Sequence, residues 1–307
     1  GINFYDDQLD LNDMGYLILN DRLMFNGRTQ FKKTRFSPGS SLRSRLFEVG
    51  YGSKFNADTV RESSNFALKV EANFIDLSEI KTEIFYRSTG RNTRITRGSL
   101  LAPYVDMPKG VGGYIEFTGP RKPKYIYSLR FERGKGSEHS PGISWKNSSR
   151  AFIKFMPRDN LSFNMSYNHA DEKNWLNWLD DNLLATYKRK QRTSVFELEW
   201  FKNNKHELRI KAQLVAFTGR DPTPYLGDKK GKLTQTDIPL SPITISELAF
   251  QIRYRYEIMP LSYLYLVYSK GGRVSLDDEE DNLSNLYRRP WNSPEKENFT
   301  VKLRYRF

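Results

Sequence analysis

The chain contains no cysteine and only three histidines among its 307 residues. Without cysteine it can form neither a disulfide framework nor a thiolate metal site. It also lacks any apolar run that approaches the ~20 residues of a membrane-spanning helix, and its mean hydropathy is −0.68. These absences exclude a helical membrane protein. They do not exclude a membrane barrel, because only every second residue of a barrel strand faces lipid.

The charge balance is strongly basic, with a formal net charge of +13. Such a charge would suggest nucleic acid as the partner of a cytosolic protein. Here, however, many lysines and arginines alternate with apolar residues instead of forming a compact basic patch. We therefore expect no nucleic-acid partner. Aromatic residues make up 14% of the chain, which suits the aromatic girdles of a membrane barrel.

Residues that could carry catalysis are scarce. His139, His169 and His206 lie in or beside different predicted loops and turns, and the pair His139 and Ser140 has no third group to activate a nucleophile. The sequence has no zinc-protease, nucleotide-binding or dinucleotide-binding motif. We expect no catalytic residues, no metal and no cofactor, and we keep a barrel hydrolase as an alternative.

Apolar residues occupy every second position of the last nine residues. They are Phe299, Val301, Leu303, Tyr305 and Phe307, and they alternate with Thr300, Lys302, Arg304 and Arg306. A period of two predicts a strand with one apolar and one basic face. A strand that ends on phenylalanine resembles the C-terminal signal of bacterial outer-membrane barrels, which implies delivery to the barrel-assembly machinery. On that basis the five apolar residues form an assembly signal.

Similar alternation recurs along the chain and predicts thirteen strands. Their approximate ranges are 16–36, 42–56, 64–76, 79–88, 111–119, 124–133, 143–156, 160–169, 186–202, 205–217, 245–258, 261–270 and 297–307. Short turns such as Ser37–Gly39 alternate with long links such as 89–110 and 218–244. This arrangement is typical of outer-membrane barrels, whose short turns face the periplasm. We predict an all-β, transmembrane, antiparallel β-barrel in the bacterial outer membrane.

The predicted barrel occupies residues 16–307, and residues 1–15 form an irregular acidic segment. Single-chain bacterial barrels usually have an even strand count, so thirteen visible strands imply 14 or more in the complete barrel. We expect the remainder from an upstream portion, a cleaved fragment or a second chain. A strand within residues 1–15 would also restore an even count.

Four stretches resemble a poorly characterised family of bacterial envelope proteins. They are Asn12–Leu17, Arg255–Pro260, Leu264–Ser269 and Leu303–Phe307. In that family a domain similar to a carbohydrate-binding module often precedes an outer-membrane barrel. The resemblance implies the same barrel here. This sequence does not include the sugar-binding domain, so no residue inherits a sugar-binding role.

Charged residues that alternate with apolar neighbours should line the inside of the barrel. The residues expected along a ligand path are Arg130, Arg209, Lys211, Arg253, Arg255, Lys302 and Arg304, accompanied by Lys69, Glu71, Lys81, Glu83, Arg87 and Glu132. Their mixed charge with a basic excess suggests a pore or transport component. The alternative is a non-conducting anchor or scaffold for a carbohydrate-binding domain or a partner complex, because opposite charges can pair across the interior.

Three further stretches carry charge or tryptophan in runs. The acidic run Asp277–Asn282 is a solvated loop, a site for divalent cations or a partner for basic groups elsewhere. Trp175–Leu179 either anchors the protein at the membrane interface or stacks on a partner. The basic residues Lys188–Arg192 lie where a strand would reach lipopolysaccharide phosphates. We therefore expect outer-membrane lipid and lipopolysaccharide as partners.

The C-terminal signal generates a prediction about assembly. Deleting Phe307, or replacing Tyr305 and Phe307 with aspartate, should lower the amount of folded barrel in the membrane, because the assembly machinery pairs with an apolar sheet edge. The measurement is the folded fraction in isolated membranes. Normal levels of folded protein in both variants would contradict the assembly role.

Overall fold

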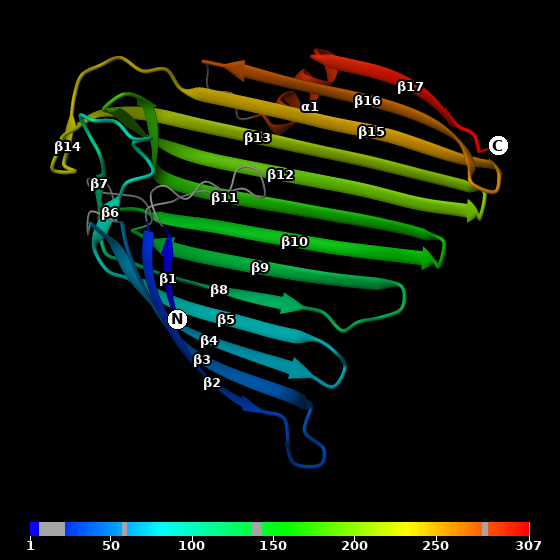
Figure 1. The fold of residues 1–307 in the computed structure, drawn as a ribbon, viewed down its shortest axis with the longest axis horizontal. Helices are drawn as coiled ribbons and strands as arrows, with labels where there is room; N and C mark the ends of the chain where they lie inside the picture. The colour runs from blue at the N-terminus through cyan, green and yellow to red at the C-terminus, as the bar shows by residue number, and fades with distance from the viewer. Residues whose placement is uncertain (6–21, 57–59, 137–142, 278–281, 307) are drawn as a thin grey trace.

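A computed structural model describes residues 1–5, 22–56, 60–136, 143–277 and 282–306, and it is dominated by one large curved antiparallel sheet (Figure 1). The sheet contains β1 (Ile2–Tyr5), β2 (Arg22–Lys33), β3 (Leu42–Phe55), β4 (Arg61–Phe74), β5 (Glu79–Arg87), β8 (Gly110–Thr118), β9 (Tyr125–Lys135), β10 (Trp145–Arg158), β11 (Leu161–Asp180), β12 (Leu183–Asn203), β13 (His206–Gly227), β14 (Leu233–Gln235), β15 (Ile243–Met259), β16 (Ser262–Leu276) and β17 (Lys296–Arg304). A second sheet joins β6 (Gly90–Asn92) to β7 (Val105–Met107), and one helix, α1, covers Leu283–Asn292. The predicted all-β antiparallel fold is confirmed.

Each of the thirteen predicted strands has a counterpart in the sheet, but several are longer than predicted. β11 continues to Asp180 and β13 continues to Gly227, through stretches that the sequence assigns to loops. The extension of β13 contains Pro222 and Pro224, residues that normally argue against a strand. A register shift between β12 and β13, with Asp221 at φ +47°, absorbs the irregularity. Strand pairing therefore overrides the local signal.

Residues 1–5 contain a strand that the sequence does not predict. β1 pairs with β2, with Ile2 opposite Phe25, whereas an irregular segment is expected there. Four residues are too few for alternation to be recognised. With β1, the path of neighbouring strands from β1 to β17 has fourteen members. Across the described residues β1 and β17 do not pair with each other, so the sheet has two open edges.

The strand registers place charged and apolar residues on opposite faces of the sheet. One row across β4, β5 and β8 aligns Glu71, Lys81 and Glu116. The adjacent row aligns Val70 and Thr82 with Ile115 on the other face. Because the side-chain period is two, each pairing register assigns a whole strand's residues to these faces at once. We call these surfaces the charged face and the apolar face.

On β4, β5, β8 and β9 the paired charged side chains are less exposed than the apolar side chains of the opposite face. The Glu71 side chain is 17% exposed, whereas Ile84 and Phe131 are 61% and 49% exposed. Long charged side chains would normally be the more exposed class. Side chains on the concave face of a curved sheet lie closer together than those on the convex face. The lower exposure of the charged side chains therefore indicates that the charged face is the inner face of the curved sheet. Figure 1 shows the curvature running from β2 to β17.

The tight turn between β4 and β5 is held by local hydrogen bonds. The Ser78 hydroxyl and amide both donate to the Asp76 carboxylate, at 2.6 and 3.0 Å. Hydrogen bonding from Ser78 lowers the pKa of Asp76 below its ordinary value. Leu77 lies between them at φ +67°, a left-handed conformation that is uncommon for leucine. Short turns of this kind alternate with longer connections at the opposite end of the sheet.

Helix α1 packs on the apolar face, inside a region that the sequence assigns to a loop. The Asn282 side chain caps it by accepting from the Ser284 amide. The Ser246 hydroxyl donates to the Leu286 carbonyl, and Leu286 is 1% exposed. The Trp291 ring packs edge-on against Phe250, with ring centroids 5.3 Å apart. Among the described residues, no helix is long and apolar enough to cross a membrane.

A small hydrophobic core lies where the longest strands end. Val105, Leu176, Leu184, Tyr225 and Leu233 form it. Residues 88–109, which connect β5 to β8 and contain β6 and β7, supply one side of this core, and we call them the cap. The Ser99 hydroxyl donates to the Asp181 carboxylate at 3.0 Å, and the Asp106 amide donates to the Gly231 carbonyl at 2.9 Å. The cap therefore attaches to the far ends of β11 to β14.

The contact between α1 and β16 generates a prediction. A Cβ atom at Gly272 would lie 2.4 Å from the Pro290 carbonyl oxygen. Gly272→Ala should therefore displace α1 and lower the free energy of unfolding by about 1–3 kcal/mol. Urea unfolding and proteolysis within residues 277–295 measure the two effects.

Gly50→Ala is the matched control for this substitution. A Cβ atom at Gly50 meets nothing within 4 Å, so the control should change stability by less than about 0.5 kcal/mol. Equal effects of the two substitutions would show that α1 does not depend on close approach at Gly272.

Candidate functional site

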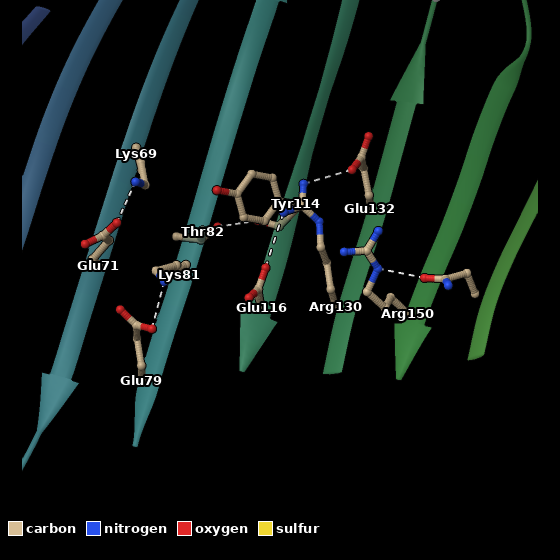
Figure 2. A network of polar contacts seen from close by, with 11 residues as sticks. Lys69, Glu71, Glu79, Lys81, Thr82, Tyr114, Glu116, Arg130, Glu132 and Arg150 are labelled. Atoms are coloured by element: carbon tan, nitrogen blue, oxygen red, sulfur yellow. Dashed lines mark hydrogen bonds and ion pairs between the residues drawn. The ribbon is translucent and has the colours of Figure 1, made fainter. Parts of the chain in front are cut away.

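Ion pairs dominate the charged face on β4, β5, β8 and β9. The Lys69 ammonium lies 2.5 Å from the Glu71 carboxylate, and the Lys81 ammonium lies 2.8 Å from the Glu79 carboxylate. Figure 2 shows both pairs side by side on β4 and β5. The Arg130 guanidinium lies between two carboxylates, 3.3 Å from Glu116 and 3.0 Å from Glu132. The same guanidinium lies 3.6 Å from the centroid of the Tyr114 ring. Positive and negative groups therefore neutralise one another over much of this area.

A polar hollow of about 530 Å³ opens beside this network, across β9 to β12. Its polar side chains on the charged face are Arg130, Glu132, Ser148, Arg150, Asn168, Gln191 and Thr193. Arg130 and Arg150 lie opposite each other in the strand register. Arg150 is exposed and donates to the Asn168 amide oxygen at 2.7 Å.

The hollow offers chemistry suited to an anionic, hydroxylated ligand. Guanidinium groups bind carboxylates and phosphates through paired hydrogen bonds. The Asn168 and Gln191 amides and the Thr193 hydroxyl can add neutral donors and acceptors. In the described part of the chain Arg150 has no carboxylate partner, so its charge is available to a ligand.

All seven residues predicted along the ligand path lie on the charged face. Arg209 is opposite Arg253, and Arg255 is opposite Tyr265, which is opposite Lys302. The registers place Lys211 and Arg304 on the same face. Six of the seven therefore gather on β13, β15 and β17, whereas Arg130 lies apart, on β9. The companion residues Lys69, Glu71, Lys81, Glu83, Arg87 and Glu132 also lie on this face.

A buried carboxylate neutralises part of the basic group on β13 and β15. Glu207 is 5% exposed, forms an ion pair with Arg209, and lies 2.8 Å from the Arg255 guanidinium. Arg209 also approaches Glu199 at 3.7 Å, and Lys211 lies 2.8 Å from Glu197. These pairs stabilise the fold and reduce the local positive potential.

Three of the predicted basic residues keep their charge uncompensated. Arg253 lies over the Tyr265 ring at 5.3 Å, and Lys302 and Arg304 are exposed on β17. As far as the structure describes the chain, none of the three has a carboxylate within ion-pair distance. The positive potential of this face therefore comes from fewer residues than alternation alone suggests.

Sequence reasoning included Arg130 and Glu132, which line the hollow, but it missed Arg150, Asn168 and the other polar residues of the lining. Strand β10 carries Phe152 on the charged face and Ser149 on the apolar face, so its alternation is broken. The run Ala151, Ile153 and Phe155 could have revealed the inward position of Arg150 by its period of two. The convergence of four strands on one hollow depends on registers, which a single sequence does not supply.

Other candidate residues have structural partners. Trp175 packs on Tyr187 and Phe217, and the Trp178 indole donates to the Asp181 carbonyl at 2.8 Å. Both rings are half-buried and in contact with the protein. His206 hydrogen-bonds to the Tyr254 hydroxyl at 2.5 Å. Within the described ranges, no serine or aspartate hydrogen-bonds to His169 or His206, and no group of three acidic or histidine residues is arranged to hold a metal ion. His139, most of the acidic run and Phe307 lie outside the described residues.

Comparison with known proteins gives one family and one solved structure. The family model described as a domain of unknown function, DUF5916, matches residues 1–307. No curated protein matches the chain. The siderophore receptor PirA from Acinetobacter baumannii is a structural neighbour with 10% sequence identity and a TM-score of 0.39. The match covers 92% of this chain and 55% of the receptor chain. A similarity at this level supports no argument about function.

The Glu207 cluster generates a prediction about stability. Glu207→Gln removes a buried negative charge and leaves Arg209 and Arg255 close together, so the free energy of unfolding should fall by about 3 kcal/mol. Glu199→Gln is the control, because that side chain is 37% exposed, and it should cost less than about 1 kcal/mol. Urea unfolding measures both. Equal losses would contradict the structural role of Glu207.

Proposed function

The chain belongs to the DUF5916 family over residues 1–307, and from this premise we propose that it forms the wall of an outer-membrane β-barrel whose charged face lines a path for polar, mainly anionic solutes. The observation that carries the proposal is the two-faced sheet. One face is apolar and exposed across many strands, and the other is charged and lies inside the curve.

The apolar face has the dimensions of a membrane-facing surface. On β13 the residues Leu208, Ile210, Ala212, Leu214 and Ala216 all point to this face. They cover nine residues, which is the length that a tilted membrane-spanning strand requires. Exposed apolar side chains recur on other strands, including Ile153 on β10, Met165 on β11 and Val301 on β17. A soluble protein rarely exposes an apolar surface of this extent, so lipid is the proposed contact.

The charged face supports a role in solute passage. Water-filled barrels have polar interiors, and rings of basic residues favour anions. Arg150, Arg253, Lys302 and Arg304 supply positive charge that no described carboxylate neutralises. In the hollow beside Arg150 a carboxylate or phosphate group of a solute can bind transiently. We propose no catalytic step for this face.

The second candidate function is a non-conducting scaffold. Dense ion pairs around Arg130 and Glu207 favour it, because paired charges can close an interior to ions. In this case the sheet would hold a carbohydrate-binding domain or a partner complex at the membrane. Measured conductance separates the two functions, since a scaffold carries no current.

The open edges of the sheet define the partners that the proposal requires. β1 and β17 each have a neighbour on one side only within the described chain. With β1 the path already has an even number of strands, and an upstream fragment or a second chain is our proposal for what pairs with the two open edges. Outer-membrane lipid and lipopolysaccharide would surround the apolar face, and the barrel-assembly machinery would insert it.

The proposed path generates a prediction about selectivity. The reconstituted protein should conduct anions in modest preference to cations. Arg150→Glu, Arg253→Glu and Arg304→Glu should each lower the anion-to-cation permeability ratio by about twofold, because charge acts strongly in a narrow polar passage with low-dielectric walls. The measurement is the reversal potential in a salt gradient across a planar bilayer.

Arg121→Glu is the matched control, since Arg121 is exposed in the turn between β8 and β9, outside the proposed path. It should leave the ratio unchanged. Arg209→Glu should have a smaller effect on the ratio than Arg253→Glu, because Arg209 is already paired with carboxylates. A cation-selective protein, or a ratio that ignores all the reversals, would rule out the basic path.

A further inference from the structure

Two cations and one tryptophan form a cluster on the apolar face that the solute path does not use. Lys135 is opposite Trp145 in the register of β9 and β10. The Arg133 guanidinium lies 4.4 Å from the centroid of the Trp145 ring, and the Lys135 ammonium lies 5.8 Å from it. Both cations are exposed, and Trp145 is 40% exposed.

The cluster differs from the cations of the charged face in its pairing. Arg130, on the same strand, lies between two carboxylates. Arg133 and Lys135, in contrast, form no ion pair with any residue that the structure describes. Their same-face neighbours on β8 and β10 are Val111, Gly113 and Asn147, none of which carries charge. The two positive charges are therefore available to an external anion.

The position of the cluster identifies the kind of anion. Leu129 and Phe131 precede it on the same face of β9 and are exposed by 55% and 49%. The cluster thus begins where the lipid-facing surface ends. It lies at the end of the sheet that carries the long connections, which is the external side in outer-membrane barrels. Tryptophan and basic residues at such a boundary contact lipid headgroups.

A second contact between a cation and a tryptophan lies on the apolar face, where Lys270 stands opposite Glu297 in the register of β16 and β17. The Lys270 ammonium lies 4.8 Å from the centroid of the Trp291 ring, and Trp291 is 43% exposed. Lys270 follows Leu264, Leu266 and Tyr268 on this face of β16, and Gly272, Val274 and Leu276 continue the face beyond it. Contacts between a cation and a tryptophan thus occur on two separated parts of the apolar face.

We propose that Arg133, Lys135 and Trp145 bind the phosphate of a phosphorylated glycolipid in the outer leaflet of the membrane. Arg133 and Lys135 are two residues apart on one strand face, about 7 Å along the strand, so both can reach one phosphate. The Trp145 ring lies against the glycolipid at the level of its headgroup. This inference rests on the membrane-barrel function proposed above.

The test measures binding of lipid A by the full-length chain in detergent micelles. Three probes are compared, namely lipid A with its phosphates, lipid A without phosphates, and free inorganic phosphate as a competitor. We expect tight binding only for the phosphorylated glycolipid. Arg133→Gln combined with Lys135→Gln should weaken it about tenfold, because two charge-assisted contacts are lost. Trp145→Ala should also weaken it.

Arg121→Gln combined with Lys122→Gln is the matched control. These two exposed cations lie in the short turn at the opposite end of the same sheet, and their removal should leave affinity unchanged. Equal affinity for the two glycolipids, or no loss in the Arg133 and Lys135 variant, overturns the inference. Competition by free phosphate as effective as by lipid A would also overturn it.

Insertion into phosphatidylcholine vesicles without lipid A separates this inference from its premise. A chain that does not insert contradicts the proposed membrane function. A chain that inserts normally, but whose glycolipid binding ignores phosphate, contradicts only the lipid site. The variants change exposed side chains, so circular dichroism should show the same strand content in each.

Discussion

The structure depends on the pairing of neighbouring strands, because the register of each pair determines which side chains share a face. A slip of one residue would move Lys81 to the apolar face and Ile80 to the charged face. The same constraint continues through fourteen neighbouring strands. Backbone hydrogen bonds alone would allow such slips. The cost of separating the charged side chains from their partners on one face excludes them.

Ion pairing follows from this arrangement. Once the registers gather charged residues on the inner face, their side chains crowd one another and lose water. Glu207 illustrates the result, since a nearly buried carboxylate is stable only beside Arg209 and Arg255. The same crowding compensates Arg130. Basic side chains have no described carboxylate partner where they are more exposed, as at Arg150 and Arg253 and on the edge strand β17.

Much of the fold could be predicted from the sequence. A strand with one charged face and one apolar face must alternate charged and apolar residues along its length, and this alternation is visible in the sequence. The thirteen predicted strands all exist for this reason. The signal disappears where both faces have similar surroundings, as in the extensions of β11 and β13, or where a strand is very short, as in β1. Helix α1 escaped prediction because it occupies one long connection and contains Pro290.

The candidate site could be predicted only in part, for a related reason. Alternation assigns Arg209, Arg253 and Lys302 to one face without knowledge of their neighbours. It cannot show that Arg209 is neutralised and Arg253 is not, since that depends on which residue stands opposite. The hollow at Arg150 requires four strands in register, and the cluster of Arg133, Lys135 and Trp145 requires the pairing of Lys135 with Trp145.

The cap has a mechanical consequence for the sheet. It begins and ends on the adjacent strands β5 and β8, yet it is bonded to the ends of β11 to β14. It therefore connects two parts of the curved sheet that are separated by β9 and β10. The angle between these strands cannot open or flatten without pulling Val105 and Leu184 out of their shared core. The part of the sheet from β5 to β14 should therefore be rigid. Any bending of the sheet should occur in the strands on either side of this part.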